Sequence, residues 1–486
     1  MLIYFLFIFP VLGIINMIVC NRNSKYLNII SLMWSCLVLV YSFMIFSSSF
    51  IELSNSLGTN LFWHLKGEKI IYWGPVFFSA DNISLYFILL SNFLIIICNI
   101  ISWKTIVFLK KEFLICLGLT NLFLIGVFLS MDLLLFYVFF EVILIPIFLV
   151  ISVWGARNQR FRASYYFFFY TLFGSLFMFI SIFKIYYECG CTSFYLLVSN
   201  SSEYQIWIFV SFFLSLAIKI PMFPVHIWLP QAHVEAPVSG SVLLAGILLK
   251  LGGYGFLRFS LPLLGEGTLY LVPLILTLSI VSIVYASILT IKQTDVKRLI
   301  AYSSVSHMGF VTLGLFSNSI DGLLASVILM IAHGFVSSGL FIAATVVYDR
   351  FHSRVIRVYK GLLVSMPILC SLFLILTLAN ISIPGSLNFW GELLAFKSSL
   401  QTVIGFFLTL FILTSIILGA VYSVNLFNIL FFGTLNVSLL FSRDIIKKEF
   451  FVLSTLCLLT WVIGILTFSF TKVLVTDILN IIVAII

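Results

Sequence analysis

Apolar runs long enough to cross a membrane dominate this sequence, and short polar stretches separate them. A helix needs about 20 residues to cross the hydrocarbon core of a bilayer. Lipid permits only helices or closed barrels, and these runs are continuous rather than alternating. The sequence therefore predicts an all-α polytopic membrane protein of about 14 transmembrane helices, near 2–20, 27–50, 80–101, 112–130, 133–153, 163–187, 204–221, 236–258, 268–291, 298–317, 321–347, 364–398, 402–432 and 450–470.

The composition excludes several other classes of protein. Charged residues make up 9% of the 486 residues and hydrophobic residues 62%, whereas a soluble chain is about 25% charged. A soluble enzyme, a disulfide scaffold and a disordered protein are therefore excluded. The net charge of +9 is spread over short loops, so no nucleic acid partner is expected.

The termini, the cysteines and the aromatic content add smaller constraints. No basic segment precedes the first apolar run, which is therefore interpreted as a mature span rather than a signal peptide. The eight cysteines show no spacing typical of zinc, haem or iron–sulfur ligands, so no metal site is predicted. The 53 phenylalanines suit AT-rich codons and hint at an organelle genome.

The lysines and arginines indicate an orientation. With the fourteen spans above, eighteen lie in odd-numbered loops, and four, Lys66, Lys69, Lys184 and Arg258, face the other side. Because basic residues concentrate in cytoplasmic loops, the odd loops are predicted to face the cytoplasm or its organellar equivalent. Both termini would then lie on the opposite side.

Six ionisable residues fall at mid-depth in apolar runs. A charge at the bilayer centre costs at least about 2.5–3.5 kcal/mol, so such residues need a partner, a cavity or a function. A histidine could simply link two helices, and a single Glu–Lys pair could be structural; Lys397 is interpreted as a snorkelling residue. Acids, amines and imidazoles together at mid-depth predict a proton relay, with the candidates Glu141, Lys219, Lys250, His307, His333 and Glu392.

Prolines predict two broken helices, and their spacing predicts an internal repeat. Pro221 and Pro224 follow Lys219, and Pro384 precedes Glu392. Interrupted spans at corresponding positions of two halves point to a transport site. The sequence predicts an N-terminal three-helix segment (1–110), two inverted five-helix repeats (111–258 and 259–433), each containing a broken helix, and a C-terminal helix and tail (434–486).

Four motifs resemble one known family. The run from Leu216 to Arg258, which includes Lys219-Ile-Pro-Met-Phe-Pro224 and His233-Val-Glu235-Ala-Pro237, is highly specific. It resembles the antiporter-like subunits of proton-pumping NADH:ubiquinone oxidoreductase, respiratory complex I. The motifs around Glu141, around His307 and from Ile383 to Glu392 match as well. Among the three sister subunits, the resemblance is greatest to the one that carries glutamate, rather than lysine, at the position of Glu392.

The resemblance implies roles for the six candidates. Glu141 and Lys219 would be the coupling pair of the first half-channel, Lys250 the central lysine, His307 and His333 connecting relay groups, and Glu392 the terminal acid. The family has no cofactor in this subunit; NADH, flavin, iron–sulfur clusters and ubiquinone are expected in other subunits. Expected partners are the other membrane-arm subunits, including the sister subunits, together with lipids and protons. The expected location is the mitochondrial inner membrane, or the plasma membrane of a bacterium.

Two alternatives remain open from the sequence. The chain could be a subunit of a multisubunit sodium/proton antiporter or of a membrane hydrogenase, which would share the fold but have a different driving partner. It could also be a scaffold that transports nothing, in which case its mid-membrane charges would be replaceable.

Overall fold

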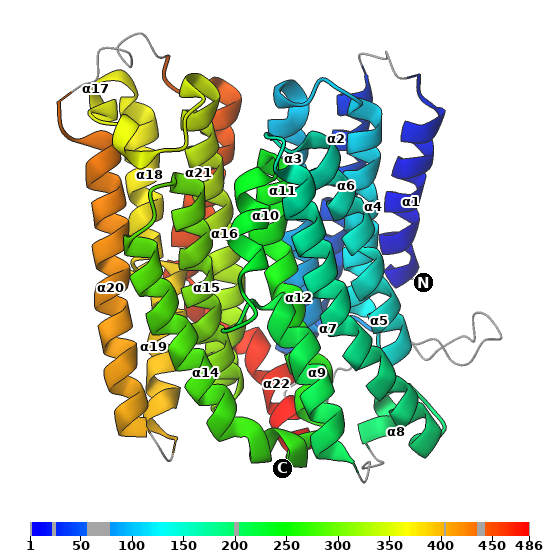
Figure 1. Cartoon of the computed structure of the whole chain (residues 1–486). Coiled ribbons are helices and arrows are strands. Elements are labelled where there is room, and N and C mark those ends of the chain that lie inside the picture. The colour runs from blue at the N-terminus through cyan, green and yellow to red at the C-terminus, as the bar shows by residue number, and fades with distance from the viewer. Residues whose placement is uncertain are drawn as a thin grey trace. The chain divides into compact units, whose positions relative to one another are not determined.

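The computed structural model describes residues 2–21, 26–55, 78–198, 204–402, 405–434 and 443–485. Within these ranges the regular elements are helices, accompanied by isolated β-bridges such as that between Asp132 and Ser193 (Figure 1). The predicted all-α class is therefore confirmed. The basic residues Arg22, Lys25, Lys66 and Lys69, which entered the orientation argument, lie outside the described residues.

The helices pack into two compact units, and the first comprises Met1–Lys219, Tyr254–Leu271 and Lys472–Ile486. In this unit α1 packs against α2 and α4, and α7 packs against α6 and α9. Asp132 caps the start of α5 by accepting a hydrogen bond from the Leu134 amide at 2.8 Å. The helices that lie wholly in this unit are α1 (Leu2–Val19), α2 (Leu27–Asn55), α3 (Asn82–Thr105), α4 (Lys110–Leu129), α5 (Leu133–Val142), α6 (Leu144–Trp154), α7 (Arg160–Cys189), α8 (Phe194–Val198), α9 (Gln205–Lys219), the π-helix η2 (Phe256–Ser260) and α13 (Leu261–Leu263).

The second unit comprises Ile220–Gly253 and Val272–Thr471. The long helix α16 (Ile320–Phe351) packs against α15, α18, α19 and α21, so it is fully surrounded by protein. The other helices of this unit are α10 (Trp228–Glu235), α11 (Val238–Leu243), the π-helix η1 (Leu244–Leu248), α15 (Val296–Leu315), the 3₁₀ helix η3 (Ile356–Val358), α17 (Leu362–Ser365), α18 (Pro367–Asn380), α19 (Leu387–Leu400), α20 (Gly405–Phe431) and α21 (Lys447–Ile465). Three helices contribute residues to both units: α12 (Leu249–Gly255), α14 (Gly265–Ile291) and α22 (Thr467–Ile485).

Each of the fourteen predicted runs coincides with a helix or a set of consecutive helices. Ten of them are long and apolar enough to span a membrane, and three shorter apolar helices lie at 4–19, 205–219 and 367–380. The run at 133–153 divides at Ile143 into α5 and α6, and the run at 236–258 contains the π-turns η1 and η2. The repeat boundaries stay a prediction, because packing into units does not measure an internal repeat.

Both predicted helix breaks are present. Helix α9 ends at Lys219 and α10 begins at Trp228, while α18 ends at Asn380 and α19 begins at Leu387. In the second break Gly385 has a φ of +98°, a conformation that side chains with a Cβ rarely adopt. The prolines remove donors and so prevent each helix from continuing through the break.

Gly464 lets α21 approach the second break closely. A Cβ at this position would overlap the carbonyl oxygen of Gly385, and Trp390 donates a hydrogen bond from Nε1 to the Gly464 carbonyl at 3.0 Å. The contact buries backbone from two elements against each other. It thereby fixes the turn that precedes Glu392.

We expect Gly464→Ala to destabilise the fold by about 1–3 kcal/mol, because the added methyl group has no space and the backbone must move. The measurement is the apparent melting temperature of the purified protein in detergent. Gly419→Ala is the matched control, since its Cβ would meet only the Tyr422 hydroxyl at 3.9 Å. Equal melting temperatures for the two variants would show that the contact is loose.

Candidate functional site

Glu141 and Lys219 come together at the ends of two helices of the first unit. Lys219 is 3% exposed; its Nζ donates a hydrogen bond to the Phe140 carbonyl at 3.4 Å and lies 4.0 Å from the centre of the Phe140 ring. Glu141 interacts electrostatically with Lys219, and its Oε1 is buried without a hydrogen-bond partner among the described residues. No direct ion pair joins these two described side chains, and the Lys219 ammonium instead faces the Phe140 carbonyl and ring.

Lys250 and His333 form a buried hydrogen bond in the second unit. Lys250 is fully buried and donates from Nζ to the Ala245 carbonyl of η1 and to His333 Nδ1, the latter at 2.9 Å. A lysine ammonium has donors only, so a charged Lys250 requires an unprotonated Nδ1 on His333. The two hydrogen bonds of Lys250 together link the π-helix η1, a feature frequent at functional sites, to the middle of α16.

His307 continues the line of polar groups in the same unit. Its ring centre lies 5.6 Å from that of His333, its Nδ1 lies 3.2 Å from Glu392 Oε1, and its Nε2 lies 3.1 Å from Asn380 Oδ1. A cavity of about 20 Å³ adjoins His307, Asn380, Glu392 and Tyr422. A polar cavity of that size has room for about one water molecule.

The structure therefore brings four of the six candidates into one continuous line: Lys250, His333, His307 and Glu392. Glu141 and Lys219 form a separate pair in the other unit. Asn380 was missed by the sequence reasoning, although it is the last residue of α18 before the break. Its position beside a broken helix was the available signal.

His233 is a second residue that the sequence reasoning did not select. Its ring is fully buried and stacks on Phe341 with centres 4.6 Å apart, and neither ring nitrogen has a hydrogen-bond partner among the described residues. Electrostatic interactions connect it with Lys250, Lys297 and His333. His233 lies in the motif from Leu216 to Arg258, but a single sequence does not show whether a histidine is buried or exposed.

A buried ion pair includes Glu235, which lies in the same motif. Arg354 donates from Nη1 to Glu235 Oε1 at 3.0 Å, and Lys297 Nζ lies 3.4 Å from the carbonyl of Ala236. Arg354 and Lys297 are 3% and 4% exposed. From the sequence, both residues were assigned to loops between spans, and their burial was not predicted.

Two further ion pairs account for charges noted in the sequence. Arg258 pairs with Asp81, and both side chains are largely buried in the first unit. Lys397, interpreted as a snorkelling residue, lies 2.7 Å from Asp321 at the start of α16 and remains 57% exposed. Among the described residues, no group of three His, Cys, Asp or Glu is arranged to hold a metal ion.

Comparison with known proteins identifies the class of this fold and site. The family model of the NADH:quinone oxidoreductase/Mrp antiporter transmembrane region matches residues 130–418. The chain belongs to this family of antiporter-like membrane subunits. The resemblance inferred from the motifs is thereby confirmed.

Two individual relatives show which subunit of the family this chain is similar to. The chain is 48% identical to NADH-ubiquinone oxidoreductase chain 4 of Metridium senile over 466 residues, covering 95% of this chain and 94% of that protein. It is 45% identical to the chain 4 of Chondrus crispus over 470 residues, covering 95% and 93%. The resemblance predicted subunit four of the family, the sister subunit with glutamate at the position of Glu392, and both relatives carry that number in their names.

Two solved structures share the fold along the whole chain. Respiratory complex I from Thermus thermophilus with bound NADH contains a chain that matches with a TM-score of 0.86 and 28% identity, covering 100% of both chains. The archaeal membrane-bound sulfane sulfur reductase contains one with a TM-score of 0.86, 19% identity and coverage of 100% and 99%. The second likeness concerns the fold alone.

For the buried ion pair of Arg354 and Glu235, we expect a single substitution to cost more stability than the double substitution. Arg354→Met should destabilise the chain by about 3–5 kcal/mol, because it leaves the Glu235 carboxylate buried without a partner. Adding Glu235→Gln should recover much of that loss. The measurement is the amount of chain assembled in membranes together with its melting temperature after purification.

The exposed pair supplies the control for this prediction. Lys397→Met should cost only about 0–1 kcal/mol, because water solvates the remaining Asp321. If the double variant at Arg354 and Glu235 were no more stable than Arg354→Met alone, the unpaired charge would not be the cause.

Proposed function

We propose that this chain is a proton-translocating membrane subunit of NADH:ubiquinone oxidoreductase. The observation that carries the proposal is the continuous line from Lys250 through His333 and His307 to Glu392. Buried ionisable groups at membrane depth are costly unless they serve a path for ions. The names of the relatives support the identity of the complex.

Within the line, two transfers follow existing hydrogen bonds. Lys250 can give a proton to Nδ1 of a neutral His333, and a protonated His307 can give one from Nδ1 to Glu392. The step between the histidines spans 5.6 Å between ring centres, so it requires ring rotation or a bridging water.

Glu141 and Lys219 provide the proposed coupling. Two unit charges 4 Å apart attract by about 4 kcal/mol at an effective dielectric of 20. Moving one proton against 100 mV costs about 2.3 kcal/mol. Opening and closing this pair is therefore large enough to drive one proton step, with Lys219 releasing its proton toward Lys250 when the carboxylate moves away.

The proposal also covers the cofactors of the complex, the partners of this chain, its location and its orientation. NADH, flavin, iron–sulfur clusters and ubiquinone are assigned to other subunits of the complex, and the partners are the sister antiporter-like subunits and membrane lipids. The proposed location is the mitochondrial inner membrane, with both termini on the side opposite the matrix. The eighteen-to-four distribution of basic residues supports that orientation.

A second candidate is a subunit of a multisubunit sodium/proton antiporter. The family description includes the Mrp antiporters, whose fold and buried charges would serve the same chemistry. The driving partner would differ. Co-purification with NADH-oxidising subunits favours the first candidate, whereas co-purification with further antiporter subunits and no NADH oxidation favours the second.

Replacing the terminal acid tests the line of groups. Glu392→Gln should slow proton pumping about tenfold, equivalent to an added barrier of about 1.4 kcal/mol, because an amide cannot accept the proton of His307. The measurement is proton uptake per NADH oxidised by the assembled complex in sealed vesicles. Asp321→Asn serves as the control, since Asp321 pairs with the exposed Lys397 rather than with a member of the line. Unchanged pumping in Glu392→Gln would remove Glu392 from the relay.

Replacing Glu141 or Lys219 tests the proposed coupling pair. Glu141→Gln and Lys219→Ala should each lower pumping by about tenfold or more, because one remaining charge cannot form the switching pair. Assembly of the complex is measured in parallel to separate lost transport from lost folding. Full pumping in both assembled variants would favour the scaffold alternative.

A further inference from the structure

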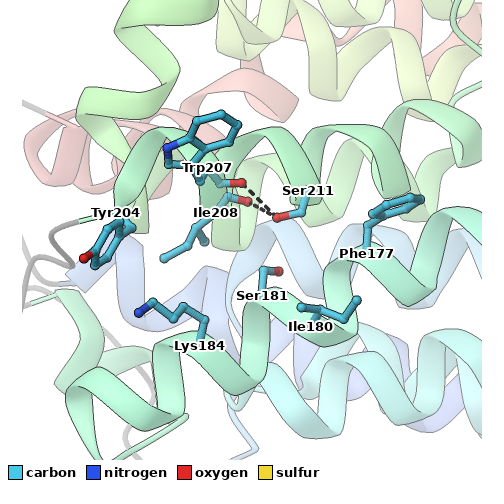
Figure 2. A pocket seen from close by; sticks show the side chains of 8 residues that line it. All are labelled: Phe177, Ile180, Ser181, Lys184, Tyr204, Trp207, Ile208 and Ser211. Carbon is cyan, nitrogen blue, oxygen red and sulfur yellow. Dashed lines mark hydrogen bonds between the residues drawn. The ribbon is translucent and has the colours of Figure 1, made fainter.

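Charged clusters of the first unit that lie outside the proposed relay differ in how their charges balance. Lys184 lies at the hollow between α7 and α9 (Figure 2), and its Nζ pairs with Glu188 Oε1 at 3.0 Å. That cluster holds one cation and one anion. A second cluster, at the start of α3, holds two acids, Asp81 and Asp477, and one cation, Arg258.

Asp477 of α22 links the elements of this second cluster. Its Oδ1 accepts a hydrogen bond from Asn82 Nδ2 and its Oδ2 accepts one from the Ile83 amide, both at 3.2 Å. Asp81, which immediately precedes α3, forms an ion pair with Arg258 of η2. Arg258 also interacts electrostatically with Asp477. The C-terminal helix is thus bonded to the N-terminus of α3, where backbone N–H groups lack partners within the helix.

Asp477 lies on the face of α22 that packs against protein. Val473 and Ile481, four residues before and four residues after it, are buried, and so is Ile478. Residues four apart share one face of a helix. The part of α22 from Lys472 belongs to the first unit, and the helix is not among the described helices that are long and apolar enough to span a membrane. An apolar face and one acid therefore hold this helix to the unit.

The charges of the cluster balance only when one proton is bound. With both carboxylates ionised, one negative charge is in excess, and an uncompensated charge is costly in a buried site. Burial, followed by the nearby Asp81 carboxylate, raises the pKa of the Asp477 carboxyl from 3.8 to about 7, against the opposing effects of its two N–H donors and Arg258. Tyr86 of α3 also interacts electrostatically with Asp477, and a phenol is neutral in this pH range.

We propose that Asp477 is a proton-binding site that couples the docking of α22 to pH. The helix docks tightly on the start of α3 when the Asp477 carboxyl carries a proton, and it loosens when the carboxyl is ionised. Because the docked carboxyl binds its proton more tightly than a carboxyl exposed to water, the proton favours the docked helix. Docking is therefore stronger at acidic pH and weakens as the pH rises through about 7, the pKa of the docked carboxyl.

The test measures hydrogen exchange of the α22 backbone amides in the intact purified assembly, at about pH 6 and about pH 8. Results are expressed as protection factors, the ratio of the intrinsic to the observed exchange rate, which removes the direct effect of pH on exchange. We expect protection to be about tenfold greater at the lower pH, because each pH unit below the pKa of the docked carboxyl adds about tenfold to the docking equilibrium. Equal protection at the two pH values would overturn the proposal.

Two variants separate a proton-binding site from a structural hydrogen-bond acceptor. Asp477→Asn has the charge and nearly the shape of the protonated acid, so protection should be high and equal at both pH values. The Asn82 amide can rotate to offer its oxygen to the new amide group. Asp477→Ala removes the acceptors altogether, so protection should be low and equal at both pH values. A purely structural acceptor predicts instead that both variants weaken docking alike.

Asp444→Asn is the matched control, because Asp444 also accepts a hydrogen bond at the start of a helix, from the Ile368 amide of α18 at 2.9 Å. This variant should leave the protection of α22 and its pH dependence unchanged. Protection lower than wild type in Asp477→Asn at about pH 8 would make Asp477 a structural acceptor only and would overturn the proposal. Failure of Asp477→Asn to assemble would also overturn it, because this variant reproduces the state in which docking is strongest. A pH dependence that persisted in Asp477→Asn would assign the proton to another group.

Discussion

The interior of a bilayer offers no water, so each polar group placed there must find its partner in the protein. This constraint explains why the buried charges occur in sets rather than singly. Lys250 bonds to His333, His307 lies between Glu392 and Asn380, and Arg354 pairs with Glu235. A charge that cannot be solvated from outside must be solvated by neighbours, and a row of such neighbours is also a route for a proton.

Breaks and π-helices in the membrane helices allow contacts between polar groups that regular helices would not allow. A continuous helix satisfies its own backbone, whereas a break or a π-turn leaves carbonyls and side chains free to face one another. Lys219 and Asn380 each end a helix at such a break, and Lys250 follows a π-turn. The polar groups thus gather where the backbone departs from regular structure.

The sequence by itself determined the class of fold, the positions of the spans, both helix breaks and the six ionisable residues at depth. These follow from run length, proline chemistry and the cost of buried charge, which are local properties of the chain. Only the tertiary structure decided which groups meet: Asn380 beside His307, His233 stacked on Phe341, and Arg354 buried against Glu235. Such meetings depend on how helices distant in sequence rotate and pack against one another, and no spacing along one chain encodes that rotation.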